Sequence, residues 1–269
     1  MIKLFVRIVV FTICCFLCGC NYSVEKSDQK PIAEKEKQPL DTLRVLVDIL
    51  NFNSDPIIPN MILKSYNKDK EVVYYYSDDG FIKASNIRNS RDCEKQYLIS
   101  KLELAKNENK NLEKYLKILK TKGMSIKYLY GKTHSDTCQI ILSTNDIGQI
   151  LYSDGQLSID HINKEINRIK LHLPTQIDEF TVWFDYSIID NNVSYLYEID
   201  ESVVSMDYVM ENYELIKSNL SEQLLGVDNG PNDSFVHQAK ALGLGMSYVY
   251  FGSITNKRME IVFKNEELL

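Results

Sequence analysis

The C-terminal half of the chain contains short runs rich in β-branched and aromatic residues, which are typical of β-strands. Two such runs, 180–188 and 193–199, flank Asp190-Asn191-Asn192, a sequence that favours a tight turn. A second pair of runs covers 246–251 and 258–263. The pattern therefore predicts two β-hairpins in this half of the chain.

Between these hairpins the apolar residues recur at helical spacing. One stripe predicts a helix over 206–225, and a second helix is expected after Pro231, ending at Gly243. The sequence Gly243-Leu244-Gly245 runs from a helix into a strand, whereas a phosphate-binding loop runs from a strand into a helix, so we expect a helix C-cap. A further amphipathic helix is expected near 160–171.

The first half of the chain follows the same order of elements. We expect strands near 57–66 and 71–77, helices near 89–106 and 111–122, and strands at 124–130 and 138–143. Gly123-Met124-Ser125 matches Gly245-Met246-Ser247 at a separation of 122 residues, and 138–147 matches 259–268 at a separation of 121. The fold class predicted is α+β, with two tandem ββααββ repeats. Each repeat would be a mostly antiparallel four-stranded sheet with two helices on one face.

The N-terminus has the pattern of a secretory signal. Two basic residues flank the start of an apolar run over 8–16, which is shorter than the roughly 20 residues that span a bilayer. The run leads into Leu17-Cys18-Gly19-Cys20, which resembles the lipobox of bacterial lipoproteins. The resemblance implies a thioether-linked lipid on Cys20, cleavage before it and acylation (such as palmitate) of the new N-terminus. Two or more acyl chains anchor a protein stably to a membrane.

The residue after the lipidated cysteine is Asn21 rather than an aspartate, so we prefer the outer membrane, and otherwise the outer leaflet of the cytoplasmic membrane. The polar, charge-alternating segment that follows predicts a disordered tether. The expected organisation is a signal peptide (1–19), lipidated cysteine and tether (20–41), first domain (42–150), connecting helix (151–172) and second domain (173–269).

Charge and cysteine content narrow the classes of partner. The formal net charge is −6, and loss of Lys3 and Arg7 with the signal makes it −8, which argues against a nucleic-acid partner. Only Cys93 and Cys138 remain in the mature fold, and they form either one disulfide or two free buried thiols. The four histidines are dispersed, so no metal site and no cofactor is expected.

The second half, from Leu173-Pro174 through Tyr195-Leu196-Tyr197 to the Gly-Met-Ser turn and the closing strand, resembles a domain of uncharacterised bacterial lipoproteins and secreted proteins. The resemblance implies an address outside the cytoplasm and a fold, and it implies no activity. The first half departs from this pattern, with Asn53 in place of Pro174.

Tyrosine is the residue class that recurs most regularly. Pairs two residues apart project from one face of a strand, and six of these tyrosines are candidates for a binding face: Tyr74, Tyr76, Tyr195, Tyr197, Tyr248 and Tyr250. The alternative is that they pack beneath the helices, because tyrosine suits half-buried strands.

Two further sets of residues are candidates for chemistry. An acidic edge on the second hairpin could bind calcium, although its spacing is not that of a calcium loop; it comprises Asp185, Asp190, Glu198, Asp200 and Glu201. Convergence of Asp185, His237 and Tyr250 within hydrogen-bond reach would favour an enzyme.

The function expected is that of a membrane-anchored lipoprotein with no catalytic residues. It would bind a protein partner in the cell envelope, as an assembly factor or as an immunity or inhibitor protein. Binding of a glycan or a small solute is the alternative, and an enzyme is the third class. The protein-binding hypothesis predicts an open sheet face or a cleft lined by tyrosine and acidic residues.

Overall fold

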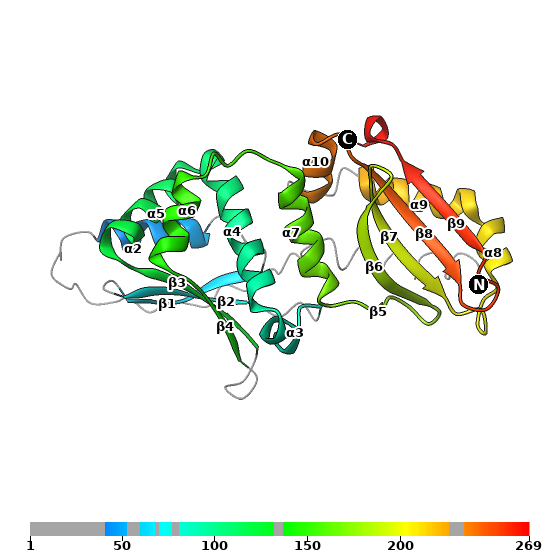
Figure 1. The fold of residues 1–269 in the computed structure, drawn as a ribbon, viewed down its shortest axis with the longest axis horizontal. Coiled ribbons are helices and arrows are strands. Elements are labelled where there is room, and N and C mark those ends of the chain that lie inside the picture. The colour runs from blue at the N-terminus through cyan, green and yellow to red at the C-terminus, as the bar shows by residue number, and fades with distance from the viewer. Residues whose placement is uncertain are drawn as a thin grey trace, which may run out of the picture.

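The structure is a computed structural model, and it describes residues 41–52, 60–67, 70–76, 81–131, 137–225 and 234–268. The predicted signal peptide, Cys20 and the tether up to residue 40 lie outside the described residues. The described part is α+β, as predicted, with two mixed sheets of four and five strands. Figure 1 shows the two sheets toward opposite ends of the molecule, with helices α4 and α7 between them.

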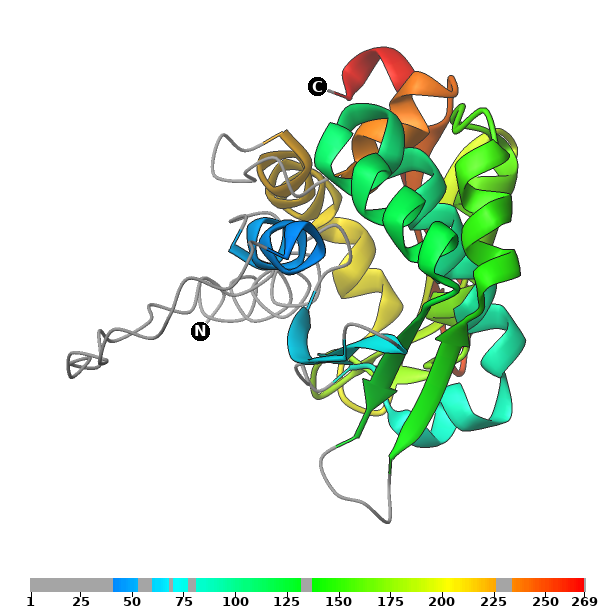
Figure 2. The ribbon, with the colours of Figure 1, turned by 90° about the vertical axis from the view of Figure 1, so that its left-hand side faces the viewer.

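The first half contains a four-stranded sheet in the order β1-β2-β3-β4. Its elements are α2 (Thr42–Phe52), β1 (Met61–Asn67), β2 (Glu71–Tyr76), α3 (Ala84–Asn89), α4 (Arg91–Glu108), α5 (Lys110–Lys122), β3 (Ser125–Tyr130), β4 (Cys138–Leu142) and α6 (Thr144–Tyr152). The outer pairs β1/β2 and β3/β4 are antiparallel, and the central pair β2/β3 is parallel. The strands of this sheet lie below the helices that cover them in Figure 2.

The second half begins after α7 (Ile159–Lys170) and contains a five-stranded sheet. Its elements are β5 (Thr175–Gln176), β6 (Thr181–Ile189), β7 (Asn192–Ile199), α8 (Met206–Glu211), α9 (Tyr213–Leu225), α10 (Ser234–Ala241), β8 (Gly245–Gly252), β9 (Arg258–Phe263) and the 3₁₀ helix η2 (Asn265–Glu267). The sheet order is β5-β6-β7-β8-β9, and again only the pair between the two hairpins, β7/β8, is parallel.

The structure corrects the prediction in three respects. Each half has three described helices between its hairpins rather than two, and β5 makes the second sheet five-stranded. The helix predicted over 206–225 is interrupted at Asn212, whose side-chain amide donates to the Tyr208 carbonyl at 2.8 Å. The local side-chain bond competes with the helical ladder, which is why asparagine favours helix ends.

Turn residues account for the chain reversals. The β6–β7 hairpin closes through Asp190 and Asn191, both with positive φ (48° and 63°), as a two-residue turn matched to strand twist requires. Gly243 has φ +77° and its N–H donates to the Lys240 carbonyl, while the N–H of Leu244 donates to the Ala239 carbonyl. Gly243 therefore caps α10, as predicted.

Each half has its own hydrophobic core, and a charged interface joins the two. Glu94 of α4 is completely buried, its carboxylate 2.8 Å from Arg168 Nε of α7 and 2.5 Å from the Tyr130 hydroxyl. The Arg168 guanidinium lies 4.2 Å from the centre of the Tyr97 ring. Ile162 and Ile166 of the same helix α7 belong to the second core. Helix α7 therefore faces the second core with its apolar side and α4 with its charged side.

Candidate functional site

The six candidate tyrosines lie mostly in the cores. Five of them are buried, with exposed fractions of 2–4%, and Tyr74 is partly buried against the first core. Rings stack across each parallel strand pair, at centroid distances of 5.7 Å (Tyr74–Tyr128), 5.4 Å (Tyr76–Tyr130), 5.0 Å (Tyr195–Tyr248) and 5.2 Å (Tyr197–Tyr250). The predicted tyrosine binding face is therefore not formed, because helices cover the sheet faces that carry these rings.

The opposite face of the second sheet carries apolar side chains that no described helix covers. In Figure 1, α8 and α9 lie behind this sheet. We define the outer face by the apolar residues that alternate with the core residues along these strands: Phe184, which is exposed, Val182, Leu196 and Phe251, which are half-buried, and Val249, which is buried. Phe184 is 38% exposed, and its ring lies 5.8 Å from that of Phe251 in an edge-on arrangement. The pair is thus partly exposed, because Phe251 is half-buried, and aromatic residues are enriched in protein interfaces.

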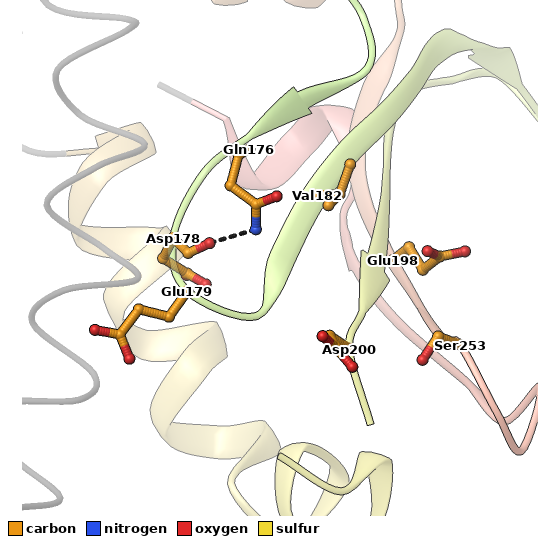
Figure 3. Close-up of a pocket in the computed structure, with 7 residues that line it drawn as sticks. All are labelled: Gln176, Asp178, Glu179, Val182, Glu198, Asp200 and Ser253. Atoms are coloured by element: carbon orange, nitrogen blue, oxygen red, sulfur yellow. Dashed lines mark hydrogen bonds between the residues drawn. The ribbon is translucent and has the colours of Figure 1, made fainter. Parts of the chain in front are cut away.

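An acidic hollow of about 680 Å³ adjoins the outer face at the ends of its strands. Its lining residues are Gln176, Asp178, Glu179, Val182, Glu198, Asp200 and Ser253, which Figure 3 shows around the β5–β6 loop and the end of β7. Four of the seven are carboxylates, and none is lysine or arginine. Val182 belongs to both the hollow and the outer face, so the two surfaces are continuous.

Asp178 and Asp200, two carboxylates of the hollow, differ in their hydrogen bonds and in the direction of their pKa shifts. The Oδ1 atom of Asp178 accepts hydrogen bonds from the N–H groups of Phe180 (3.0 Å) and Thr181 (2.8 Å), while Oδ2 is buried with no hydrogen-bond partner among the described residues. Burial raises the pKa of Asp178 despite these bonds. Hydrogen bonds from the hydroxyl and N–H of Ser202 lower the pKa of Asp200, so this carboxylate is ionised at neutral pH.

The five residues of the predicted acidic edge do not form one site in the structure. Only Glu198 and Asp200 line the hollow, whereas Asp185 forms an ion pair with Lys170 at 3.0 Å and Asp190 lies in the hairpin turn. The Glu201 carboxylate accepts from the N–H groups of Ile254 and Thr255, from the Thr255 hydroxyl and from the N–H of Met206. These bonds, that of the Thr255 N–H first, lower the pKa of Glu201 to about 2. Glu201 thus joins the β8–β9 turn to the start of α8.

No hydrogen bond or ion pair joins the three candidate catalytic residues in the described structure. Asp185 is paired with Lys170, His237 lies exposed on α10, and the Tyr250 hydroxyl is buried without a hydrogen-bond partner. Within the same described ranges, no group of three histidine, cysteine or acidic side chains is arranged to hold a metal ion.

Cys93 and Cys138, the cysteines within the described residues, are free thiols. Cys93 lies half-buried in the first turn of α4, and Cys138 is buried at the start of β4. Burial, followed by the charge of neighbouring Glu94, raises the pKa of Cys93. Of the two alternatives for this pair, the structure has the free thiols and not the disulfide.

Sequence reasoning missed the aromatic and acidic residues that make the outer face and the hollow. Phe184, Phe251, Asp178 and Glu179 were not among the predicted site residues. One signal could have indicated the two phenylalanines: Val182–Phe184 and Tyr248–Phe251 are apolar on both strand faces, whereas a strand with one solvated face alternates apolar and polar residues.

Comparisons with known proteins add little to this geometry. No family model matches the chain, and no curated protein matches it. A crystal structure of a Pseudomonas aeruginosa protein, provisionally assigned as secreted, is similar over 40% of this chain and 89% of that one, with 15% identity and a TM-score of 0.33. No described helix has the length and apolar character needed to cross a membrane.

Proposed function

We propose that this chain is a lipid-anchored envelope protein that binds another protein through the outer face of its second sheet, without catalysis. The observation that supports this most directly is the exposed Phe184–Phe251 pair beside a hollow lined by four carboxylates. When a partner covers apolar side chains that contact water, the free energy of the system falls, which favours binding. If this chain is an assembly factor, the partner is the protein that it helps to assemble; if it is an immunity protein, the partner is a toxin.

The address rests on the N-terminal signal. Leu17-Cys18-Gly19-Cys20 supports lipidation of Cys20, and the outer membrane, or otherwise the outer leaflet of the cytoplasmic membrane, is the proposed location. Replacing Cys20 with Ser should abolish acylation and release the protein from the membrane fraction. Membrane retention of the Cys20→Ser variant, at the level of the unsubstituted chain, would contradict the proposed anchor.

The two halves are proposed to be tandem repeats of one hairpin–helices–hairpin unit. The same stacked tyrosine pairs across the parallel strands support this, as do the left-handed glycines Gly123 and Gly243 after equivalent helices. After equivalent strands, a carboxylate accepts from the backbone N–H three residues before it: Asp146 from Ser143 and Glu267 from Lys264, both at 2.7 Å. Pairing register matches Gly123 to Gly243 at a separation of 120, rather than to Gly245 as the sequence comparison had it.

Glycan or small-solute binding remains the second candidate, because the hollow is large enough for a small polar ligand. Such a ligand would favour a pocket with aromatic walls between the two halves, whereas this hollow lies at the strand ends of the second sheet and has no aromatic lining. The outer face therefore favours a protein partner. An enzyme is the least supported class.

Purification of the anchored, tagged chain from its native cell tests the proposal. We expect one or more co-purifying proteins whose recovery falls at least several-fold in the Phe184→Ser variant. Ile141→Ser is the matched control, since Ile141 is 42% exposed on the edge strand of the first sheet. Absence of any partner under gentle conditions, or equal loss in both variants, would contradict binding through the outer face.

A further inference from the structure

We infer, resting on the proposed function, that the partner presents an extended segment in which a lysine or arginine lies two residues from a large apolar residue. The basic side chain would enter the acidic hollow, and the apolar one would cover the Phe184–Phe251 pair. Residues two apart project from the same side of an extended segment, so both could contact the second sheet together.

The apolar half of the surface is continuous with the hollow. In sheet register Val182 lies beside Glu198, Glu198 beside Phe251, and Phe251 beside Arg258, whose charge is paired with Glu260. In this row of described residues, Glu198 is therefore the unpaired charge, between two apolar side chains. The next row holds Leu196 and Val249. A partner side chain that contacts Glu198 in the hollow therefore lies one strand spacing from an apolar side chain of the sheet.

The negative charge of the hollow favours a basic residue in the partner segment. The hollow holds four carboxylates and no cationic lining residue, and the two nearby cations of the β8–β9 hairpin are already paired, Arg258 with Glu260 and Lys257 with Asp207. A concave surface of one charge sign concentrates counter-charged groups.

The same charges disfavour a bilayer as the occupant. Bacterial membrane surfaces are generally anionic, and a membrane-binding face is accordingly rich in lysine and arginine around its apolar residues. The outer face is instead bordered by Glu179, Glu198 and Asp200. The exposed aromatic pair is therefore suited to a cationic polypeptide and not to lipid.

A synthetic peptide tests the inference without the natural partner. The probe is a fluorescent octapeptide, Lys-Ser-Leu-Ser repeated twice, which places lysine and leucine on one side of an extended chain. Binding to the full-length chain is followed by fluorescence anisotropy. Control peptides replace both lysines by glutamate or both leucines by serine, and detergent micelles without protein correct for non-specific binding.

The protein variant that removes charge from the hollow is Glu198→Gln/Asp200→Asn, and its matched control is Asp92→Asn/Glu108→Gln on α4, where both carboxylates are exposed. We expect the hollow variant to weaken peptide binding about tenfold, with Kd of the control unchanged within about twofold. Higher ionic strength should weaken binding to the unsubstituted chain. Circular dichroism checks that both variants are folded.

Three results would overturn the inference: no binding of the lysine peptide at millimolar concentration, equal binding of the glutamate peptide, or equal affinity for the hollow variant. Purification with Phe184→Ser distinguishes these failures from failure of the proposed function. If a partner depends on Phe184 but the hollow variant retains it, only the partner chemistry is wrong. If no partner depends on Phe184, the binding face itself is wrong.

Discussion

Replacement of Arg168 by Met tests how the two halves are joined. The substitution keeps an unbranched side chain that can pack on Tyr97, but leaves the Glu94 carboxylate completely buried with only the Tyr130 hydroxyl as its partner. Removing one partner of a buried ion pair costs about 3–5 kcal/mol, because the remaining charge is desolvated and uncompensated. Glu94→Gln/Arg168→Met, which removes both charges, should recover most of this loss.

Urea unfolding followed by circular dichroism measures the effect. With a denaturant dependence of about 2 kcal/mol per molar urea, the Arg168→Met midpoint should fall by about 2 M. The control is Arg44→Met, which breaks an exposed pair with Asp48 at 3.2 Å and should change stability by less than about 0.5 kcal/mol. A cost for Arg168→Met no greater than that of the control, or no recovery in the double variant, would refute the reasoning.

Three further predictions follow from the site and the cores. The pKa of Glu201 is lowered from 4.5 to about 2, so its contribution to stability is fully present above pH 4.5 and is lost as the pH falls toward 2. Thermal unfolding midpoints measured across this range should therefore fall less steeply for Glu201→Gln than for the unsubstituted chain. Equal slopes would count against the bonds from Glu201 to the β8–β9 turn. Tyr248→Ala should cost about 3–5 kcal/mol in chemical unfolding because the side chain is buried. Phe184→Ser on the outer face should cost less, about 1–2 kcal/mol, because Phe184 is 38% exposed, and the reverse order would place the binding face on the wrong side of the sheet. Cys93 and Cys138 should both react with a thiol reagent in denaturant, whereas Cys138 should be protected from the reagent in the native state because it is buried. If both became reactive only after reduction, they would form a disulfide.

Local sequence patterns predicted most strands because strand identity depends on near neighbours. The hairpin over Asp190 and Asn191 was placed within one or two residues, since its turn requires residues that tolerate positive φ. The helix Thr144–Tyr152 was not predicted, although Ser143 and Asp146 form a capping box. Its nine residues follow directly on the strand expected at 138–143, and the sequence predicted no separate element there.

Long-range features were beyond prediction from one sequence. The tyrosine pattern was compatible with a buried or an open face, because two-residue spacing defines a common side but not which side the helices cover. The pairing of Glu94 with Arg168 spans 74 residues and depends on the antiparallel approach of α4 and α7. The hollow likewise combines the β5–β6 loop, the end of β7 and Ser253, which no local motif relates.

The central claim is that a protein partner contacts the outer face of the second sheet. Photo-cross-linking measures this directly, with benzoylphenylalanine in place of Phe184 in the anchored chain in its native cell. Tyr152, which is 86% exposed on α6 in the first half, is the control position. We expect a discrete protein adduct from position 184 and none from position 152. No adduct at 184, or the same adducts at both positions, would contradict it.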